Sequence, residues 1–263
     1  MHPNGRHVVV TGGLGGIGLP LVNRLKQAGA DVTVIDRPGQ HPPQGVQFLA
    51  ADMASPDAVA ELAAHLAAKP IDMLINLVGV NYFGPYATHP TADLRRLIQI
   101  NLLTPLELTR AVLPGMLARQ QGQIVNVGSV TGSLALPYGA AYSASKGGLK
   151  AFSEALRRET RGRGVSVTYI APRAVKTPMN QGLVTQLNQQ AGNREDTPGK
   201  VADHIMAAIQ ADKASVTIGQ PERLLVVLNG LCPALFDRAL MRFRRLADAL
   251  LQADHNPHEN LAK

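Results

Sequence analysis

Residues 6–18, RHVVVTGGLGGIG, decide the fold that we expect for this chain. The apolar, β-branched run at positions 7–10 predicts a buried β-strand. A glycine-rich turn follows at 11–18, and residues 19–30 then carry apolar side chains at helical spacing. Such a turn lets backbone N–H groups approach a pyrophosphate closely, and the N-terminus of the helix adds partial positive charge. The stretch therefore predicts a dinucleotide-binding unit, although a merely flexible turn would look similar.

Short apolar runs recur along the chain with helical segments between them. The expected strands are HVVV, DVTVI, VQFLA, IDMLIN, QIVNV, VSVTYI and SVTI. Alternating strands and helices imply parallel strands joined by right-handed crossovers. We therefore predict an α/β fold, with a doubly wound, mostly parallel Rossmann-type sheet of about seven strands and helices on both faces. Polar or conformationally special residues lie at or just past the strand ends, where such sheets bind ligands. These are Gly12, Asp36, Asp52, Asn76, Ser129 and Pro172.

Length and composition favour a single globular domain. The 263 residues, 45% of them hydrophobic, suit one domain over 1–263, with 221–263 as a C-terminal helical extension. The net charge is +7, but the basic residues are scattered and only 4% of the residues are aromatic, so we expect no nucleic-acid partner. The histidines show no metal-ligand spacing, and we expect no metal site.

The compartment can also be predicted. Cys232 is the one cysteine, which excludes an intramolecular disulfide and fits a reducing compartment; we expect its side chain to be buried. The first residues, MHPNGRHVVV, contain no hydrophobic signal stretch, and no apolar run approaches membrane-spanning length. We therefore expect a cytoplasmic protein.

The second informative stretch is GSVTGSLALPYGAAYSASK, residues 128–146. Tyr142 and Lys146 are four residues apart and would share one face of a helix. The lysine ammonium would favour the phenolate and lower the tyrosine pKa from about 10 by about three units, so that Tyr142 becomes a usable acid or base. Ser129 would hold the substrate oxygen. A surface tyrosine beside a solvated lysine is the alternative.

These stretches together resemble the classical short-chain dehydrogenase/reductase family, from about residue 7 to residue 219. The resemblance implies that Ser129, Tyr142 and Lys146 are catalytic. It further implies that Asn101, in IQINLLTP, is the fourth catalytic residue and holds a water in a proton relay to the lysine. Three positions depart from the family pattern, one of them Val78 in place of an alanine. Leu77 stands where the family has a second asparagine, and Arg173 replaces a glycine; it would face an acidic ligand group or lie in solvent.

Residues at the end of the second expected strand bear on whether the cofactor is NAD or NADP. A carboxylate at Asp36 can accept hydrogen bonds from both adenosine ribose hydroxyls and repels a 2′-phosphate, which favours NAD over NADP. Arg37 acts in the opposite direction, because it could pair with that phosphate, whereas Gly15 lacks the basic side chain of many NADP-dependent relatives. The expected cofactor contacts, from motif and resemblance together, are Gly12, Leu14, Gly16, Ile17, Gly18, Asp36, Arg37, Asp52, Met53, Asn76, Gly79, Tyr142, Lys146, Pro172 and Thr177.

The expected activity is hydride transfer between a nicotinamide cofactor and a moderately apolar secondary alcohol or ketone. Apolar side chains at 80–83, 134–138 and 179–192 suggest that substrate class, and the polar stretch 180–196 suggests a mobile lid. A non-catalytic protein that senses dinucleotides is the rival from another class. It would have no physical need for the four catalytic residues.

Two features concern partners. Residues 234–251 place Leu235, Ala239, Phe243, Leu246 and Leu250 on one helical stripe, with arginines to another side. We expect this helix to cap the pocket or to pack on a neighbouring subunit; a basic amphipathic helix on an anionic membrane is the alternative. The family resemblance implies a homodimer or homotetramer built on helices around 102–119 and 142–161.

Overall fold

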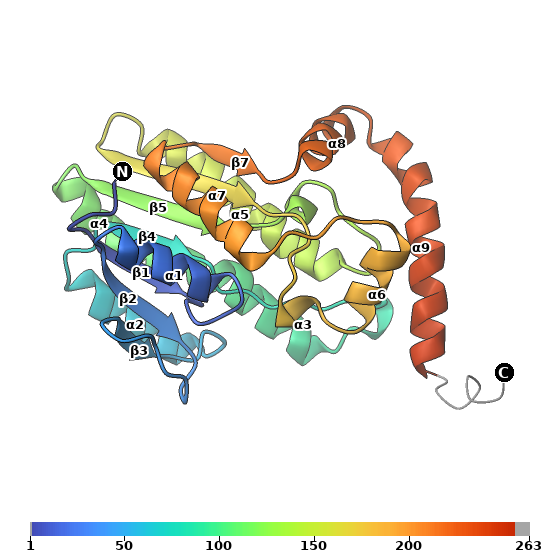
Figure 1. Ribbon diagram of the computed structural model, residues 1–263, viewed down its shortest axis with the longest axis horizontal. Helices are drawn as coiled ribbons and strands as arrows, with labels where there is room; N and C mark the ends of the chain where they lie inside the picture. The colour runs from blue at the N-terminus through green and yellow to red at the C-terminus, as the bar shows by residue number, and fades with distance from the viewer. Residues whose placement is uncertain (1, 256–263) are drawn as a thin grey trace.

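The expected strands are all present in the computed structural model, which describes residues 2–255 and side chains up to residue 253. Within these residues a seven-stranded sheet has the order β3-β2-β1-β4-β5-β6-β7, and every neighbouring pair is parallel (Figure 1). The strands are β1 (His7–Thr11), β2 (Asp31–Asp36), β3 (Gln47–Ala50), β4 (Met73–Asn76), β5 (Gly122–Val127), β6 (Val165–Ala171) and β7 (Ser215–Thr217).

Helices cover both faces of the sheet, which confirms the predicted architecture. On one face lie α1 (Gly18–Gln27) and α7 (Pro198–Gln210); on the other lie α2 (Pro56–Ala67), α4 (Thr104–Ala118) and α5 (Ala140–Glu159). Successive side chains of β1 alternate between the two layers, as the pleat of a strand requires. Val8 and Val10 pack in the core under α1 and α7, and Val9 packs in the core under α2 and α4. Strands buried on both faces explain why the sequence shows continuous apolar runs.

The remaining elements lie around the carboxyl ends of the strands or beyond β7. They are η1 (Tyr86–Thr88), α3 (Thr91–Ile98), the π-helical turn η2 (Gln99–Leu103), η3 (Val130–Gly132), η4 (Pro178–Asn180), α6 (Leu183–Gln190), α8 (Gln220–Leu231) and α9 (Pro233–His255). The strand order reverses between β1 and β4, whose ends meet where Thr11 pairs with Asn76. A doubly wound sheet opens a ligand crevice at this reversal.

The C-terminal extension contains two helices that differ from the expectation in detail. Its last residues, 256–263, lie outside the described part of the chain. On α9 the buried side chains include Phe236 and Ala247, whereas Leu235 of the predicted stripe is 63% exposed. The stripe was therefore assigned to the wrong side at its beginning, because helical spacing alone does not show which face meets the body.

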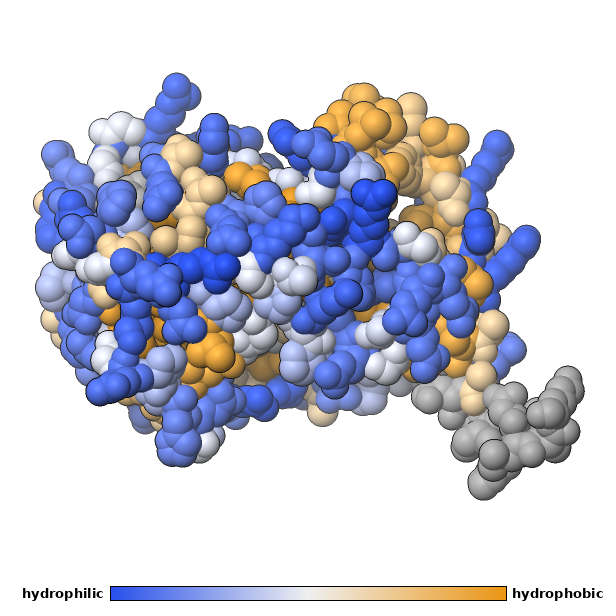
Figure 2. All heavy atoms as spheres, viewed as in Figure 1, coloured by the Kyte–Doolittle hydropathy of each residue, from blue (hydrophilic) through white to orange (hydrophobic). Residues whose placement is uncertain are grey.

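Apolar side chains gather on the surface over α8 and the beginning of α9 (Figure 2). Cys232, between these two helices, is exposed, so the expectation of a buried thiol was wrong. None of the helices in residues 2–255 combines the length and the hydropathy that a membrane crossing requires.

Candidate active site

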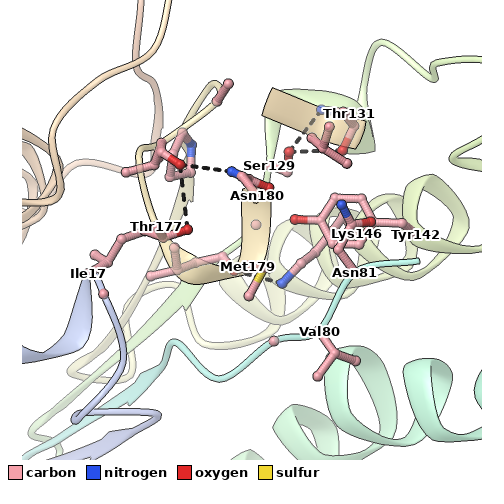
Figure 3. Close-up of a pocket in the computed structure, with 18 of the residues that line it drawn as sticks. Ile17, Val80, Asn81, Ser129, Thr131, Tyr142, Lys146, Thr177, Met179 and Asn180 are labelled. Atoms are coloured by element: carbon pink, nitrogen blue, oxygen red, sulfur yellow. Dashed lines mark hydrogen bonds between the residues drawn. The ribbon is translucent and has the colours of Figure 1, made fainter. Parts of the chain in front are cut away.

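A cavity of about 660 Å³ lies at the carboxyl edge of the sheet and receives most of the residues that the sequence singled out. Ser129, Tyr142 and Lys146 line it together with the glycine-rich turn, and Figure 3 shows Tyr142 and Lys146 beside each other with Ser129 nearby. All the expected cofactor contacts except one line the same cavity. These are Gly12, Leu14, Gly16, Ile17, Gly18, Asp36, Arg37, Asp52, Met53, Gly79, Tyr142, Lys146, Pro172 and Thr177.

Glycine is required at two positions of the turn for different reasons. Gly12 has a φ of +69°, and a Cβ placed there would lie 2.8 Å from the Cα of Val78. A Cβ on Gly18 would collide with the backbone carbonyl of Gly12, where the first turn of α1 passes close to the end of β1. The missing side chains leave backbone and helix N-terminus open toward the cavity, which is the arrangement that suits a pyrophosphate.

Asp36 is held rigidly at the end of β2. One carboxylate oxygen accepts a hydrogen bond from the backbone N–H of Leu14 at 3.0 Å, and the other accepts from the N–H of Arg37 at 2.9 Å. The side chain is only 8% exposed but lines the cavity. A fixed carboxylate here can accept further hydrogen bonds and gives this end of the cavity a negative charge.

The side chains of Tyr142 and Lys146 project from α5; Lys146 is buried and Tyr142 is partly buried. The lysine Nζ lies 5.9 Å from the centroid of the tyrosine ring and donates a hydrogen bond to the carbonyl of Val127 at 3.2 Å. Ser129 stands opposite, at the end of β5. Its Oγ accepts hydrogen bonds from the N–H of Thr131 at 3.2 Å and from the hydroxyl of Thr131 at 2.8 Å. The serine is thereby oriented before any ligand arrives.

The electrostatics of the pair differ from the expectation. Burial raises the pKa of Tyr142 above its usual value, and a hydrogen bond with Ser129 opposes that change only in part. Burial also lowers the pKa of Lys146 to about 8. The prediction that the lysine charge lowers the tyrosine pKa was therefore wrong for the protein groups by themselves, because burial disfavours the charged form of each side chain.

Tyr169 is a supporting residue that the sequence reading missed. Its hydroxyl lies 3.4 Å from the backbone N–H and from the carbonyl of Ser129, and also 3.4 Å from the carbonyl of Lys146. The side chain projects from β6 and is 3% exposed. A tyrosine hydroxyl in a buried strand usually has a hydrogen-bond partner, so Tyr169 in the apolar run VSVTYI could have been recognised from the sequence as a residue that joins elements. Those partners tie the loop of Ser129 to the helix of Lys146.

Two of the predicted site residues, Asn76 and Asn101, do not line the cavity. Asn76, expected to contact the cofactor, donates hydrogen bonds to Asn126 at 2.8 Å and to Thr109 at 3.2 Å inside the protein. That expectation was wrong because the side chain points into the α4 and α5 layer, where it joins neighbouring elements. The end of β4 is tied to β1 instead by Thr11, whose Oγ1 accepts from the N–H groups of Leu77 and Val78.

Asn101 is fully buried in the π-helical turn η2, behind the cavity wall. Its amide forms two 2.8 Å hydrogen bonds with the backbone of Val80, accepting from the N–H and donating to the carbonyl. It also donates to the hydroxyl of Ser145, next to Lys146. The side chain thus fixes the loop after β4 relative to α5.

The far wall of the cavity comes from the C-terminal part of the chain. Leu225 of α8 and Phe243 of α9 line it, as do Leu187 and Asn188 of α6, the helix within the predicted lid. Arg173 lines the cavity and its side chain is only 12% exposed, so the expectation that it lies in solvent was wrong, whereas a role facing an acidic ligand group stays a prediction. Its guanidinium holds the buried carboxylate of Asp196 with two hydrogen bonds, at 2.8 and 2.9 Å, and contacts Glu222 of α8 at 3.4 Å.

Comparison with known proteins agrees with this geometry. Residues 6–188 match the model of the short chain dehydrogenase family. "Dehydrogenase/reductase SDR family member 7B" from Bos taurus is 32% identical, over 89% of this chain and 79% of that protein. "Ketoacyl reductase HetN" from Nostoc sp. is 28% identical, over 89% of this chain and 88% of that protein. Among solved structures, a putative NAD(P)-dependent gluconate 5-dehydrogenase from Beutenbergia cavernae with bound NADP has a TM-score of 0.72 and 28% identity, covering 81% of this chain and 94% of that one.

Proposed function

Because the chain belongs to the short-chain dehydrogenase family, and so to a family of nicotinamide-dependent oxidoreductases, we propose that it transfers hydride between NAD and a moderately apolar secondary alcohol or ketone. The observation that carries this proposal is the single cavity lined both by the glycine-rich turn and by Ser129, Tyr142 and Lys146. Gly12, Gly18 and Asp36 fit a dinucleotide, since backbone N–H groups and a rigid carboxylate face the space it would occupy.

In this proposal Tyr142 transfers the proton at the substrate oxygen. A bound nicotinamide ring would supply or accept the hydride. The raised pKa keeps the Tyr142 hydroxyl protonated near neutral pH, which suits proton donation to a carbonyl oxygen during reduction. Ser129, held by Thr131, stabilises the charge that develops on that oxygen. Lys146 would hold the ribose hydroxyls, and Asn101 would order the loop beside it and a water in the proton relay.

The preference for NAD rests on Asp36. Its carboxylate is held by two backbone N–H groups, so it cannot turn away from a 2′-phosphate without losing them. Two observations favour NADP instead. The similar Beutenbergia structure holds NADP, and Arg37, next to Asp36, also lines the cavity. Titration of the protein with NAD and NADP under identical conditions separates the two, and tighter binding of NADP would contradict the proposed preference.

The substrate class rests on the far wall. Leu225, Phe243 and Leu187 present apolar surface there, and the part of the extension over 221–255 caps the cavity. The relative HetN is named a ketoacyl reductase, and a ketoacyl group contains a ketone. Phe243→Ala should raise KM several-fold for apolar ketones while kcat changes little, because it removes binding surface and no reacting group.

Turnover distinguishes the enzyme from a dinucleotide sensor. A panel of secondary alcohols and ketones, each with both cofactors, is followed at the absorbance band of reduced nicotinamide. Tyr142→Phe serves as the control for activity that does not arise at this site. Cofactor binding without turnover of any compound, in the wild-type protein, would favour the sensor. A homodimer or homotetramer built on α4 and α5, and a cytoplasmic location, complete the proposal; light scattering after size-exclusion chromatography tests the first.

A further inference from the structure

Helix α8 attaches to the protein through polar side chains and exposes most of its large apolar side chains. Glu222 pairs with Arg173 at 3.4 Å, and the amide of Asn229 donates to the carbonyl of Ser133 at 2.9 Å. Farther along, Asp248 of α9 accepts a hydrogen bond from the hydroxyl of Tyr138. Polar contacts therefore attach the extension to the loops around the cavity, and none of the α8 residues is buried.

The outer side of α8 carries large apolar side chains. Leu224 is 61% exposed, Val227 58% and Leu231 73%, and Leu235 continues the surface onto α9 with 63%. We call these four residues the α8 face; Figure 2 shows apolar side chains concentrated in this part of the molecule. An amphipathic helix in a globular protein normally has the reverse arrangement, with apolar residues inward. Contiguous exposed apolar surface marks an interaction site.

Positive charge accompanies this apolar surface. Arg238, Arg242 and Arg245 of α9 follow one another at helical spacing and are exposed, as is Arg223 of α8. None of the four forms an ion pair with the described residues. The carboxylates of Glu222 and Asp248 are occupied by Arg173 and Arg244, so of the acidic groups described on these helices only Asp237 remains to offset the arginines.

The same helices connect this surface to the cavity. Leu225 lines the cavity and is still 37% exposed, adjacent in the chain to Leu224. Phe243 lines the cavity from α9 and is half-buried. Apolar surface thus continues from the α8 face to the far wall of the cavity, which is the arrangement that an entry from an apolar phase requires.

We propose that the α8 face and the arginines of α9 bind the surface of an anionic phospholipid bilayer, with the helices lying in the interface. Apolar side chains would enter the boundary of the acyl region, and the arginines would contact lipid phosphates. A second copy of the chain fits less well. A second copy would present the same surface, where the described carboxylates of Glu222 and Asp248 are already paired, so the arginines would find few acidic partners there.

Cosedimentation of the full-length protein with vesicles tests the proposal. We expect binding to vesicles of phosphatidylcholine with phosphatidylserine or phosphatidylglycerol, much weaker binding to phosphatidylcholine alone, and weakening by salt. Leu224→Glu and the double variant Leu224→Glu/Leu231→Glu should reduce binding at least ten-fold. Arg238→Gln and Arg242→Gln should each reduce it about five-fold on anionic vesicles, the equivalent of about 1 kcal/mol.

Tyr86→Glu is the matched control, because Tyr86 is also 61% exposed but belongs to η1 and to neither of the C-terminal helices. It should bind vesicles as the wild type does, and circular dichroism of all variants checks that they fold. Equal loss of binding in Tyr86→Glu, or no preference for anionic vesicles, would overturn the proposal. So would an oligomer that Leu224→Glu converts to monomers without any vesicle binding, since the α8 face would then be a subunit interface.

Discussion

The two walls of the cavity are built in different ways. The cofactor wall consists of short motifs whose members are close in sequence, such as Gly12 and Gly18 or Tyr142 and Lys146. The far wall consists of segments joined by contacts over long sequence distances, such as Arg173 with Glu222 and Tyr138 with Asp248. We infer that substitutions of the reactive side chains in the first wall change chemistry with little loss of stability, whereas substitutions in the second loosen the structure around the substrate.

The largest expected effect belongs to the first wall. Tyr142→Phe should lower kcat by at least 10²-fold, because it removes the proton donor and keeps the ring. Cofactor affinity and thermal stability should stay close to those of the wild type. Steady-state kinetics with the best substrate of the panel, and a cofactor titration by fluorescence, measure both. Most of the activity surviving in the variant would disprove the role of Tyr142.

A second effect on this wall concerns pH and stability. Lys146 has a pKa of about 8 in the folded protein and its ordinary value, near 10.5, when unfolded. Between these values the unfolded chain binds the extra proton, so folding stability contributed by this group rises with pH, by up to about 3 kcal/mol. Below pH 8 the cost of burying the charge is fully present.

Lys146→Met removes this dependence. The stability of the variant relative to the wild type should therefore be greatest below pH 8 and should decline as the pH rises to 10.5. Urea unfolding at intervals across that range measures the difference. A difference that stays constant with pH would mean that the lysine is not desolvated as the structure indicates.

Substitutions in the far wall should lower the free energy of unfolding. Arg173→Met leaves the buried carboxylate of Asp196 with Lys200 as its remaining partner and releases Glu222 of α8. We expect a loss of about 2 kcal/mol in unfolding free energy and faster hydrogen exchange in α8 than in α1. Arg24→Met, which breaks an exposed pair with Asp203, is the matched control and should change little. Similar results for the two variants would contradict the proposed attachment of α8.

The smallest expected effect is on the choice between NAD and NADP, which Asp36 and Arg37 of the cofactor wall should influence. Asp36→Ala should lower the preference for NAD over NADP by about ten-fold, the worth of one charge-assisted hydrogen bond. Arg37→Ala should change the preference in the opposite direction if that side chain contacts a 2′-phosphate. Binding constants for both cofactors measure these ratios. An unchanged ratio in Asp36→Ala would show that the carboxylate does not select the cofactor.

The same contrast explains what the sequence could and could not predict. The strands, the glycine-rich turn and the positions of Ser129, Tyr142 and Lys146 follow from local patterns and from motif spacing, and they were predicted. Periodicity did not reveal that the carboxylate of Asp196 would meet Arg173, because that pair closes only when two distant loops pack. It also did not reveal the direction of Asn76, whose partners Asn126 and Thr109 lie on other elements.

The pKa of Tyr142 could not be predicted from sequence for a similar reason. A lysine four residues away suggests attraction between charges, but the burial of both groups depends on the whole fold. The α8 face was hidden because LLVVLNGL resembles a core segment in composition. Which side of a helix meets the protein is a property of packing, and only the structure supplies it.

The π-helical turn η2 has a consequence for insertions and deletions. It lies between α3 and α4, and such a turn contains one residue more than the α-helical path it replaces. Loss of one residue there would join the two helices regularly but rotate one against the other by about 100°. Asn101 could then no longer reach both backbone groups of Val80. Changes of length should be accepted in the loop at 38–46, none of whose residues is buried, whereas at η2 the helical phase itself is under constraint.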